Sequence, residues 1–259
     1  MDLGISGRKA IVCASSRGLG KGCALNLARA GCAVIVNGRD EAVTRATAEE
    51  IARATGATVT AIAADVSTPE GQAALFAACP APDILVNNNA GPPRRDYREL
   101  SRADILQGVI QNMVTPIELI QKVADGMAAR RFGRIVNITS LSVYNAVAGL
   151  DLSSGARAGL TAFLAGVART YASDNVTINN ILPGKMDTDR LRSGLSFTAE
   201  RLDISPDEAM RREIATIPAG RLGTADEFGA LCAFLCSVHA GYITGRNFLV
   251  DGGLNPSAF

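Results

Sequence analysis

The chain has 259 residues, of which 26 are lysine or arginine and 25 are aspartate or glutamate, so its formal net charge is only +1. Such a balance provides no electrostatic field for nucleic acid or an acidic membrane surface, and neither is expected as a partner. A hydrophobic fraction of 47% is ordinary for a globular protein. The length suits one large α/β domain over residues 1–259 with a substantial core.

Two further features point to a reducing compartment and argue against a membrane. No apolar run approaches membrane-spanning length, and the opening MDLGISGRK has neither a signal-peptide h-region nor a transit-peptide pattern. The cysteines fall on apolar segments without a CxxC pair, at positions 13, 23, 32, 79, 232 and 236. We therefore expect a cytoplasmic protein with reduced core cysteines, no disulfide and no metal.

Short apolar runs alternate with helical patterns along the chain. The expected strands are residues 10–13, 33–36, 58–63, 82–86, 134–138, 176–182 and 247–250. The expected helices are residues 20–30, 40–56, 101–130 and 153–172, with further helices opening at Thr68 and at capping boxes that begin with Ser205 and Thr224. Strands and helices that alternate with short connections predict a single-domain, Rossmann-like, doubly wound parallel sheet flanked by helices on both faces.

Residues 189–217 interrupt this alternation with polar and helical sequence. In such a sheet the ligand lies beyond the carboxyl ends of the strands. The interruption follows the sixth expected strand, so we expect it to form a mobile lid over a substrate.

The first expected strand runs into a small, glycine-bearing turn. Gly18 and Gly20 permit a tight turn where a pyrophosphate can approach the N-terminus of a helix. The usual G-x-G-x-x-G fingerprint is not met, because the residue three after Gly20 is Cys23. The turn fits a looser T-G-x-x-x-G-x-G pattern, with Cys13 and Ala14 in place of Thr and Gly.

Five stretches together make the chain similar to the short-chain dehydrogenases/reductases, and most closely to their 3-oxoacyl-carrier-protein reductase-like branch. They are ASSRGLG (14–20), DILVNNNAGPP (83–93), GRIVNITS (133–140), NNILPGKMDT (179–188) and YITGRNFLVDGG (242–253). The resemblance implies cofactor contacts at the turn, the adenine, the ribose and the nicotinamide. By position in this chain these are Ala14, Ser16, Arg17, Gly18, Leu19, Gly20, Asp65, Val66, Asn88, Pro183, Gly184, Met186 and Thr188. The register of the Asn87-Asn88-Asn89-Ala90-Gly91 run is ambiguous by one residue, and Asn88 is our choice.

The end of the second strand bears on the choice of cofactor. An NAD site places a carboxylate there, which would repel a 2′-phosphate. This chain has Asn37, with Arg39 two residues on and Arg17 in the glycine turn. Two guanidinium groups suit a phosphate, so the sequence predicts NADP(H). The alternative is that Arg39 is a solvated loop charge.

The resemblance also implies a catalytic set that the chain matches only in part. In the family a serine orients the substrate carbonyl, and a tyrosine 13 positions later protonates it. A lysine four positions after the tyrosine lowers the tyrosine pKa and holds the nicotinamide ribose, and an asparagine completes a water-linked proton relay. Ser140 and Asn112 stand at the first and last of these positions, but the other two hold Ser153 and Arg157. No Tyr-x-x-x-Lys occurs, since the lysines are at 9, 21, 122 and 185. Arg157 can bond ribose hydroxyls, whereas Ser153 is a poor general acid.

Two other residues could deliver the proton. Tyr144 lies in the loop after Ser140, and Lys185 follows Pro183-Gly184, where a desolvated lysine can become a usable acid. The alternatives are a half-buried wall residue for Tyr144 and a solvent-facing charge for Lys185. Halohydrin dehalogenases also carry an arginine at the lysine position, but they keep the tyrosine and lose the glycine turn.

The sequence therefore predicts an NADP(H)-dependent oxidoreductase that moves hydride between nicotinamide and a carbonyl/alcohol or imine/amine pair of a small-molecule substrate. Two alternatives stay open: a catalytically inactive NADP-binding sensor or scaffold, and a non-redox lyase or isomerase on the same fold. By resemblance we expect a homotetramer, or a homodimer.

Overall fold

The structure is a computed structural model that describes residues 1–89, 91–92, 94–147 and 149–257. Ala90, in the Asn-Asn-Ala-Gly segment, lies outside the described residues. Within them the chain forms a parallel sheet of seven strands in the order β3-β2-β1-β4-β5-β6-β7, which confirms the predicted fold. The strands are β1 Lys9–Val12, β2 Ala33–Gly38, β3 Val59–Ala63, β4 Ile84–Asn87, β5 Gly133–Ile138, β6 Val176–Pro183 and β7 Asn247–Val250.

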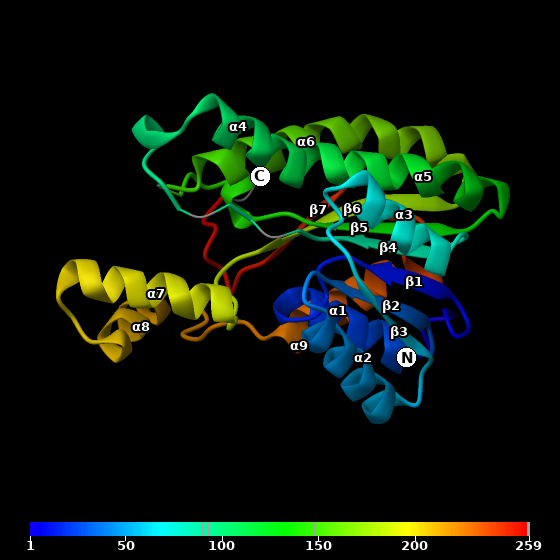
Figure 1. Ribbon diagram of the computed structural model, residues 1–259, viewed down its shortest axis with the longest axis horizontal. Helices are drawn as coiled ribbons and strands as arrows, with labels where there is room; N and C mark the ends of the chain where they lie inside the picture. The colour runs from blue at the N-terminus through cyan, green and yellow to red at the C-terminus, as the bar shows by residue number, and fades with distance from the viewer. Residues whose placement is uncertain (90, 93, 148, 258–259) are drawn as a thin grey trace.

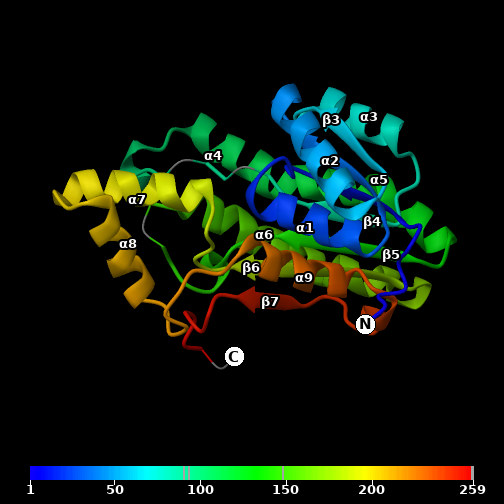
Figure 2. The ribbon, with the colours of Figure 1, turned by 90° about the horizontal axis from the view of Figure 1, so that it is seen from below.

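Helices cover both faces of this sheet (Figures 1 and 2). One face carries α1 Gly18–Arg29, α2 Glu41–Thr55 and α9 Ala225–Leu235, and the other carries α3 Pro69–Ala78, α5 Thr115–Ala129 and α6 Asp151–Tyr171. Each layer has its own apolar core against the strands, because the strands are buried on both sides. The six cysteines are buried with free thiols. No helix in the described ranges is both long and apolar enough to cross a membrane.

Glycines allow α1 and α9 to pack very closely. A Cβ at Gly22 would lie 2.1 Å from the carbonyl oxygen of Ala225, and a Cβ at Gly229 would lie 2.2 Å from that of Gly22. Larger residues would force the helices apart. This contact fixes α1, and with it the turn that precedes α1.

The long helical segment expected over 101–130 is helical from end to end, with a change of helix type near its centre. Ser101 and Asp104 form a capping box at the start of α4 Arg102–Val109, and α5 begins at Thr115. Between them Ile110–Val114 forms a π-helical turn, which the sequence did not predict. A π turn inserts one extra residue and reorients the side chains that follow, and it places Asn112 at the turn's centre.

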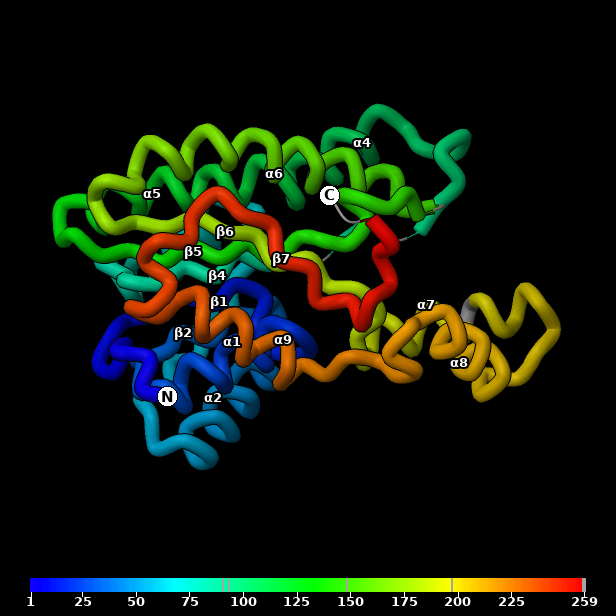
Figure 3. The backbone as a smooth tube through the Cα atoms, turned by 180° about the vertical axis from the view of Figure 1, so that it is seen from behind, coloured from blue at the N-terminus to red at the C-terminus, as the bar shows by residue number. Residues whose placement is uncertain are grey.

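The predicted lid segment forms a helical hairpin that projects from the body of the molecule (Figures 1 and 3). It consists of α7 Asp189–Leu202 and α8 Pro206–Ala215. The capping box expected at Ser205 forms only in part: its hydroxyl accepts from the Glu208 backbone, but the Glu208 carboxylate pairs with Arg211 and Arg212. The box at Thr224 is complete.

Candidate active site

The turn between β1 and α1 folds back tightly on itself. Ala14 has a φ of 43° and Gly18 one of 55°, both in the left-handed region. A Cβ at Gly20 would lie 2.4 Å from the carbonyl oxygen of Ala14, so only glycine fits there. Arg17 is the N-cap residue of α1 and makes no side-chain capping bond, so no side chain covers the first N–H groups of α1. This end of α1 is open to an anion.

The side chain of Asn37, at the cofactor position that ends the second strand, is engaged within the protein itself. Its Oδ1 accepts from the Ala14 backbone at 3.0 Å, and its Nδ2 donates to the carbonyls of Ile62 and Ala64. Since the residue is buried and its amide is fully engaged, Asn37 supports the glycine turn instead. Sequence reasoning missed this role because it depends on the pairing of β2 with β3.

Two exposed arginines flank the same region. Arg17 and Arg39 have no ion pair within the described parts of the chain. Burial acts to raise the pKa of Asp65, but hydrogen bonds from Ser67 and the charge of Arg39 outweigh it and lower that pKa. The Arg39 guanidinium therefore lies near the Asp65 carboxylate, just after the carboxyl end of β3.

Three residues expected to contact the cofactor pack their side chains against the apolar cores. Val66 and Met186 are 3% and 4% exposed, whereas Leu19, in the first turn of α1, is half-buried. Val66 and Met186 can therefore offer a ligand only their backbones. Ser16 accepts from Thr47 through its backbone oxygen, and Asn88 donates from Nδ2 to the carbonyl of Ala14 at 3.1 Å.

A small polar cavity lies between the end of β4, the π turn and α6. Asn112 donates from Nδ2 to the Gly108 carbonyl, while its Oδ1 is buried without a hydrogen-bond partner. Asn87 Oδ1 and Thr115 Oγ1 line the same cavity, and both are also buried without a hydrogen-bond partner among the described residues. Three convergent unpartnered oxygens indicate a site for water or a polar ligand group.

Arg157 borders this cavity from α6. Its Nη1 donates to the carbonyls of Ile138 and Thr139 at 2.6 and 3.0 Å, and its Nε donates to Ser153 Oγ at 3.0 Å. The residue is 9% exposed, and burial together with the charge of Arg190 lowers the pKa of Arg157 to about 10. It therefore remains a cation at neutral pH.

Ser140 follows β5 directly. Its Oγ accepts from the Ser142 backbone at 3.1 Å, which leaves the hydroxyl proton available to a ligand. The carbonyl of its neighbour Thr139 holds Arg157, so β5 and α6 bring Ser140, Ser153 and Arg157 together as the sequence spacing implied.

An asparagine ladder, which sequence reasoning missed, crosses the sheet beneath these residues. Each Nδ2 donates to the Oδ1 of the next asparagine: Asn87 to Asn137 at 2.9 Å, Asn137 to Asn180 at 3.1 Å and Asn180 to Asn247 at 2.8 Å. The four residues are register partners on β4, β5, β6 and β7. The ladder ends where Asn247 donates to the hydroxyl of Tyr144 at 2.8 Å.

The segment after β6 joins the glycine turn to the hairpin. Gly184 packs against Asp251, and a Cβ at Gly18 would lie 3.6 Å from Thr188 Cγ2. Thr188 also caps α7. Lys185 forms an ion pair with Glu213 of α8, so its ammonium is not a free group beside Pro183.

Comparison with known proteins identifies the family. The sequence profile described as enoyl-(acyl carrier protein) reductase matches residues 13–255. The chain belongs to the short-chain dehydrogenase/reductase family. It is 31% identical to the NADPH-dependent reductase BacG of Bacillus subtilis, over 96% of this chain and 98% of that protein. It is 32% identical to the 3-oxoacyl-[acyl-carrier-protein] reductase FabG of Pseudomonas aeruginosa, over 98% and 100%.

Solved structures of this family superpose on the whole chain. YwfH, an NADPH-dependent reductase involved in bacilysin biosynthesis, has a TM-score of 0.91 at 30% identity and covers 97% of this chain and 100% of its own. L-sorbose reductase of Gluconobacter frateurii, solved with NADPH and L-sorbose, has a TM-score of 0.93 at 25% identity, over 99% and 100%. The chain therefore carries the fold of NADPH-dependent short-chain reductases from end to end.

Proposed function

We propose that this short-chain dehydrogenase/reductase is an NADP(H)-dependent oxidoreductase that acts on a carbonyl/alcohol or imine/amine pair of a small substrate. The observation that carries the cofactor choice is a pair of exposed arginines, Arg17 in the glycine turn and Arg39 just after β2, neither of which forms an ion pair within the described residues. A 2′-phosphate offers two guanidinium groups a charge-assisted contact that a hydroxyl lacks. The relatives BacG and L-sorbose reductase use NADPH, which supports the same choice.

The residues present fit a dinucleotide. The turn at Ala14 to Gly20 is a cradle that a Cβ at Gly20 would fill, and the start of α1 offers N–H groups that no side chain caps. Arg17 and Arg39 would hold the 2′-phosphate, Asn88 would support the turn, and Thr188 would close the cradle from the α7 side.

The site residues divide the chemistry between them. When bound, NADPH supplies the hydride. Ser140 donates its free hydroxyl proton in a hydrogen bond that orients and polarises the carbonyl. Arg157 holds ribose hydroxyls through its remaining N–H groups and keeps a positive charge near the reacting centre. Asn112 and the polar cavity hold water that can resupply a proton.

Without a Tyr-x-x-x-Lys pair, another group must deliver the proton. The Tyr144 hydroxyl accepts from Asn247 and is free to donate, and the residue is 48% exposed. Ser153 is a far weaker acid, and Lys185 is held by Glu213. We therefore favour Tyr144, with Lys185 second. An imine or a pre-polarised carbonyl would lessen the need for a strong acid.

Replacement of the two candidates tests the assignment. Tyr144→Phe should lower kcat with little change in KM, because an interaction made in the transition state is lost. Lys185→Met should leave kcat within about twofold. Unchanged turnover in Tyr144→Phe eliminates Tyr144 as the donor.

Nucleotide binding tests the proposed function itself. Wild-type protein should bind NADPH more tightly than NADH, and Arg39→Ala should remove about tenfold or more of that preference, as expected for one charge-assisted phosphate contact. Arg45→Ala is the matched control, since Arg45 pairs with Glu41 on the surface of α2. Transfer of deuterium from 4-deuterated NADPH into a product then separates an oxidoreductase from an NADP-binding scaffold and from a non-redox lyase or isomerase.

We also propose that the α7–α8 hairpin is a lid and that the chain assembles as a homotetramer. Apolar side chains stand exposed over α4, the π turn and α6, namely Ile105, Leu106, Ile110, Val114 and Phe163. Burial of such a surface between copies is favourable. Light scattering after gel filtration measures the assembly, and a monomer contradicts it.

A further inference from the structure

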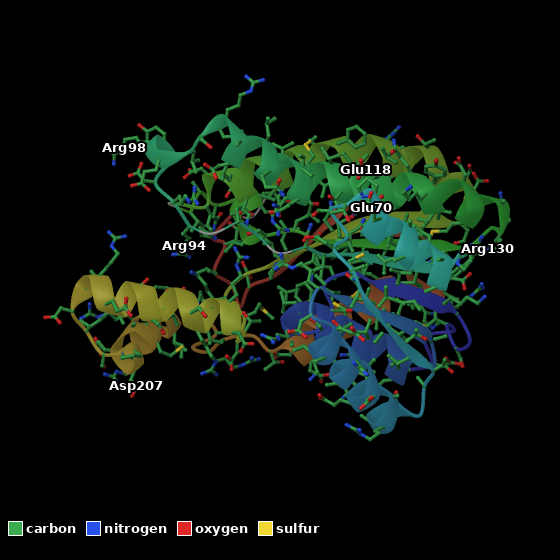
Figure 4. The ribbon with its side chains drawn as sticks, in the orientation of Figure 1. Glu70, Arg94, Arg98, Glu118, Arg130 and Asp207 are labelled. Carbon is green, nitrogen blue, oxygen red and sulfur yellow. The ribbon has the colours of Figure 1, made fainter. Side chains whose placement is uncertain are left out.

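Three arginines without a carboxylate partner converge at the carboxyl edge of the sheet. Arg94 lies in the loop after β4, Arg157 lies on α6 against the end of β5, and Arg190 lies in the first turn of α7. Among the residues the structure describes, none of the three forms an ion pair. Figure 4 shows Arg94 between α4 and α7 in that view.

Contacts with backbone atoms fix two of these arginines in place. The Nη1 and Nη2 of Arg190 donate to the carbonyls of Gly91 and Pro92 at 3.0 and 3.1 Å, which ties α7 to the loop after β4. A Cβ at Gly91 would lie 2.6 Å from Arg190 Nη2, so this loop and the guanidinium are in close contact. Arg157 commits Nε and Nη1 to Ser153, Ile138 and Thr139, while its Nη2 makes no hydrogen bond within the described residues, and the residue borders the polar cavity.

The charges of the three arginines act on one another. Burial and then the charge of Arg190 lower the pKa of Arg157, and burial and then the charge of Arg94 lower the pKa of Arg190. No carboxylate offsets either effect. Like charges held together at a half-enclosed site repel unless an anion joins them.

The adjacent arginines behave differently. Arg95 pairs with Asp104 at 3.0 Å, and Arg192 pairs with Asp187 at 2.8 Å. The acidic neighbour Asp189 acts on Arg192. The nearby carboxylates are therefore engaged with other arginines, and the unpaired charge is confined to Arg94, Arg157 and Arg190.

We propose that Arg94 and Arg190, with the positive charge of Arg157 behind them, bind the carboxylate of an anionic substrate, so that the substrate is an oxo acid or the corresponding hydroxy acid. This inference rests on the proposed function, because it places the substrate at Ser140. Arg157 bonds the carbonyl of Thr139, one residue before Ser140, and Arg190 in the first turn of α7 bonds the loop after β4, which also carries Arg94. A planar guanidinium matches a carboxylate with two parallel hydrogen bonds. The 2′-phosphate has its own pair, Arg17 and Arg39.

Paired probes test the charge requirement. We would measure dissociation constants of 2-oxopentanoate, 4-oxopentanoate and their methyl esters by calorimetry, with saturating NADP⁺ and again without nucleotide. We expect at least one acid to bind about tenfold or more tightly than its ester, the equivalent of one charge-assisted contact. If no acid binds more tightly than its ester, the inference is overturned.

Matched variants locate the effect. Arg94→Gln and Arg190→Gln should each weaken acid binding about tenfold while ester binding stays unchanged, and Arg95→Gln and Arg192→Gln should change neither. Because Arg190→Gln also loses its contacts with the loop after β4, Arg190→Lys is added; it keeps the charge and should retain part of the affinity.

The cofactor is the other possible source of an anion. If Arg190→Gln weakens NADPH binding about tenfold and leaves acid binding intact, these arginines serve a cofactor phosphate and the inference is wrong. Failure of the proposed function has a different signature. NADPH then fails to bind, or deuterium is not transferred, while the preference for acid over ester without nucleotide is still measured.

Discussion

The buried arginines at the two edges of the sheet differ in how fully their guanidinium groups are hydrogen-bonded. At the amino edge Arg134 is 1% exposed, yet every arm of its guanidinium is bonded: Nε to the Ser237 carbonyl, Nη1 to the carbonyls of Gly133 and Asn175, and Nη2 to Asn175 Oδ1. At the carboxyl edge the Nη2 of Arg157 has no hydrogen-bond partner in the part of the chain that the structure describes. In Figure 4 the labelled Arg130 lies on the amino-edge side and the labelled Arg94 on the carboxyl-edge side.

The partners of the surrounding arginines repeat this difference. Arg8 and Arg130 share Asp83 at the start of β4, and the guanidinium groups of Arg8 and Arg134 stack on Phe132. A buried cation is stable when hydrogen bonds or counter-charges replace its water. At the amino edge the protein itself supplies these hydrogen bonds and counter-charges. At the carboxyl edge a bound ligand would supply them.

Loss of Arg134 should have the largest effect on stability. Arg134→Met removes four hydrogen bonds and leaves the Asn175 and Ser237 carbonyls without their cationic donor, so we expect a loss of about 3 kcal/mol or more. Urea denaturation measures this loss. Affinity for NADPH should be unchanged at temperatures where the variant is folded.

The matched change at the other edge should behave in the opposite way. Arg157→Met loses three hydrogen bonds but also removes a buried charge that Arg190 repels, so stability should change by about 1 kcal/mol or less. Turnover should fall about a hundredfold or more, since a charge near the reacting centre is lost. Equal destabilisation by the two variants would contradict the comparison.

The asparagine ladder provides the next largest effect. Asn137→Leu removes the centre of the ladder, so Asn87 Nδ2 keeps only its 3.4 Å bond to the Pro116 carbonyl, and Asn180 Oδ1 loses its donor inside the sheet. We expect a loss of about 2–3 kcal/mol in free energy of unfolding, the penalty for two buried polar groups that lose their ladder partners. Asn145→Leu is the control, because Asn145 lies in the loop after β5, outside the ladder. A loss below about 0.5 kcal/mol would show that the ladder is not a stabilising network.

Much of this molecule could be predicted from the sequence, because the relevant signals are local. Apolar runs and caps predicted the strands and nearly all helices, and the structure confirms the parallel sheet. Short motifs also pointed to Ser140 and Asn112, which the structure places at the end of β5 and within the π turn. Each of these patterns lies within a few consecutive residues of the sequence.

The features that were missed depend on pairing between distant segments. Asn87, Asn137, Asn180 and Asn247 each stand in an apolar strand, which is an unusual place for asparagine, yet the ladder exists only because their strands are in register. Arg190 matters because α7 docks on the loop after β4. The supporting role of Asn37 was missed for the same reason, since its acceptors lie on and just after β3.

Strain at the carboxyl edge should be measurable at Ala14. An alanine in the left-handed region costs about 1 kcal/mol, whereas glycine is unstrained there but loses more entropy on folding. We expect Ala14→Gly to change stability by between about 0 and +1 kcal/mol and to preserve NADPH binding. Ala10→Gly, on the buried strand β1, is the control and should destabilise. A clear loss in Ala14→Gly would mean that the turn is not strained.

The smallest effect concerns Glu227, because its contacts are exposed. Hydrogen bonds from Arg221 and from Thr224 lower the pKa of Glu227 to about 2. Since this folded-state pKa lies below the unfolded value near 4.5, the stabilisation is present above about pH 4.5 and is lost as the pH falls toward 2. The difference in Tm between wild type and Glu227→Gln should therefore be largest at pH 5–7 and shrink at pH 3. Asp207→Asn is the matched control, because Asp207 lies at the start of α8 and has no ion pair among the described residues (Figure 4). If the difference in Tm between wild type and Glu227→Gln is the same at every pH, the charge of Glu227 does not contribute to stability. Arg221 would then be held as well by the glutamine amide as by the carboxylate.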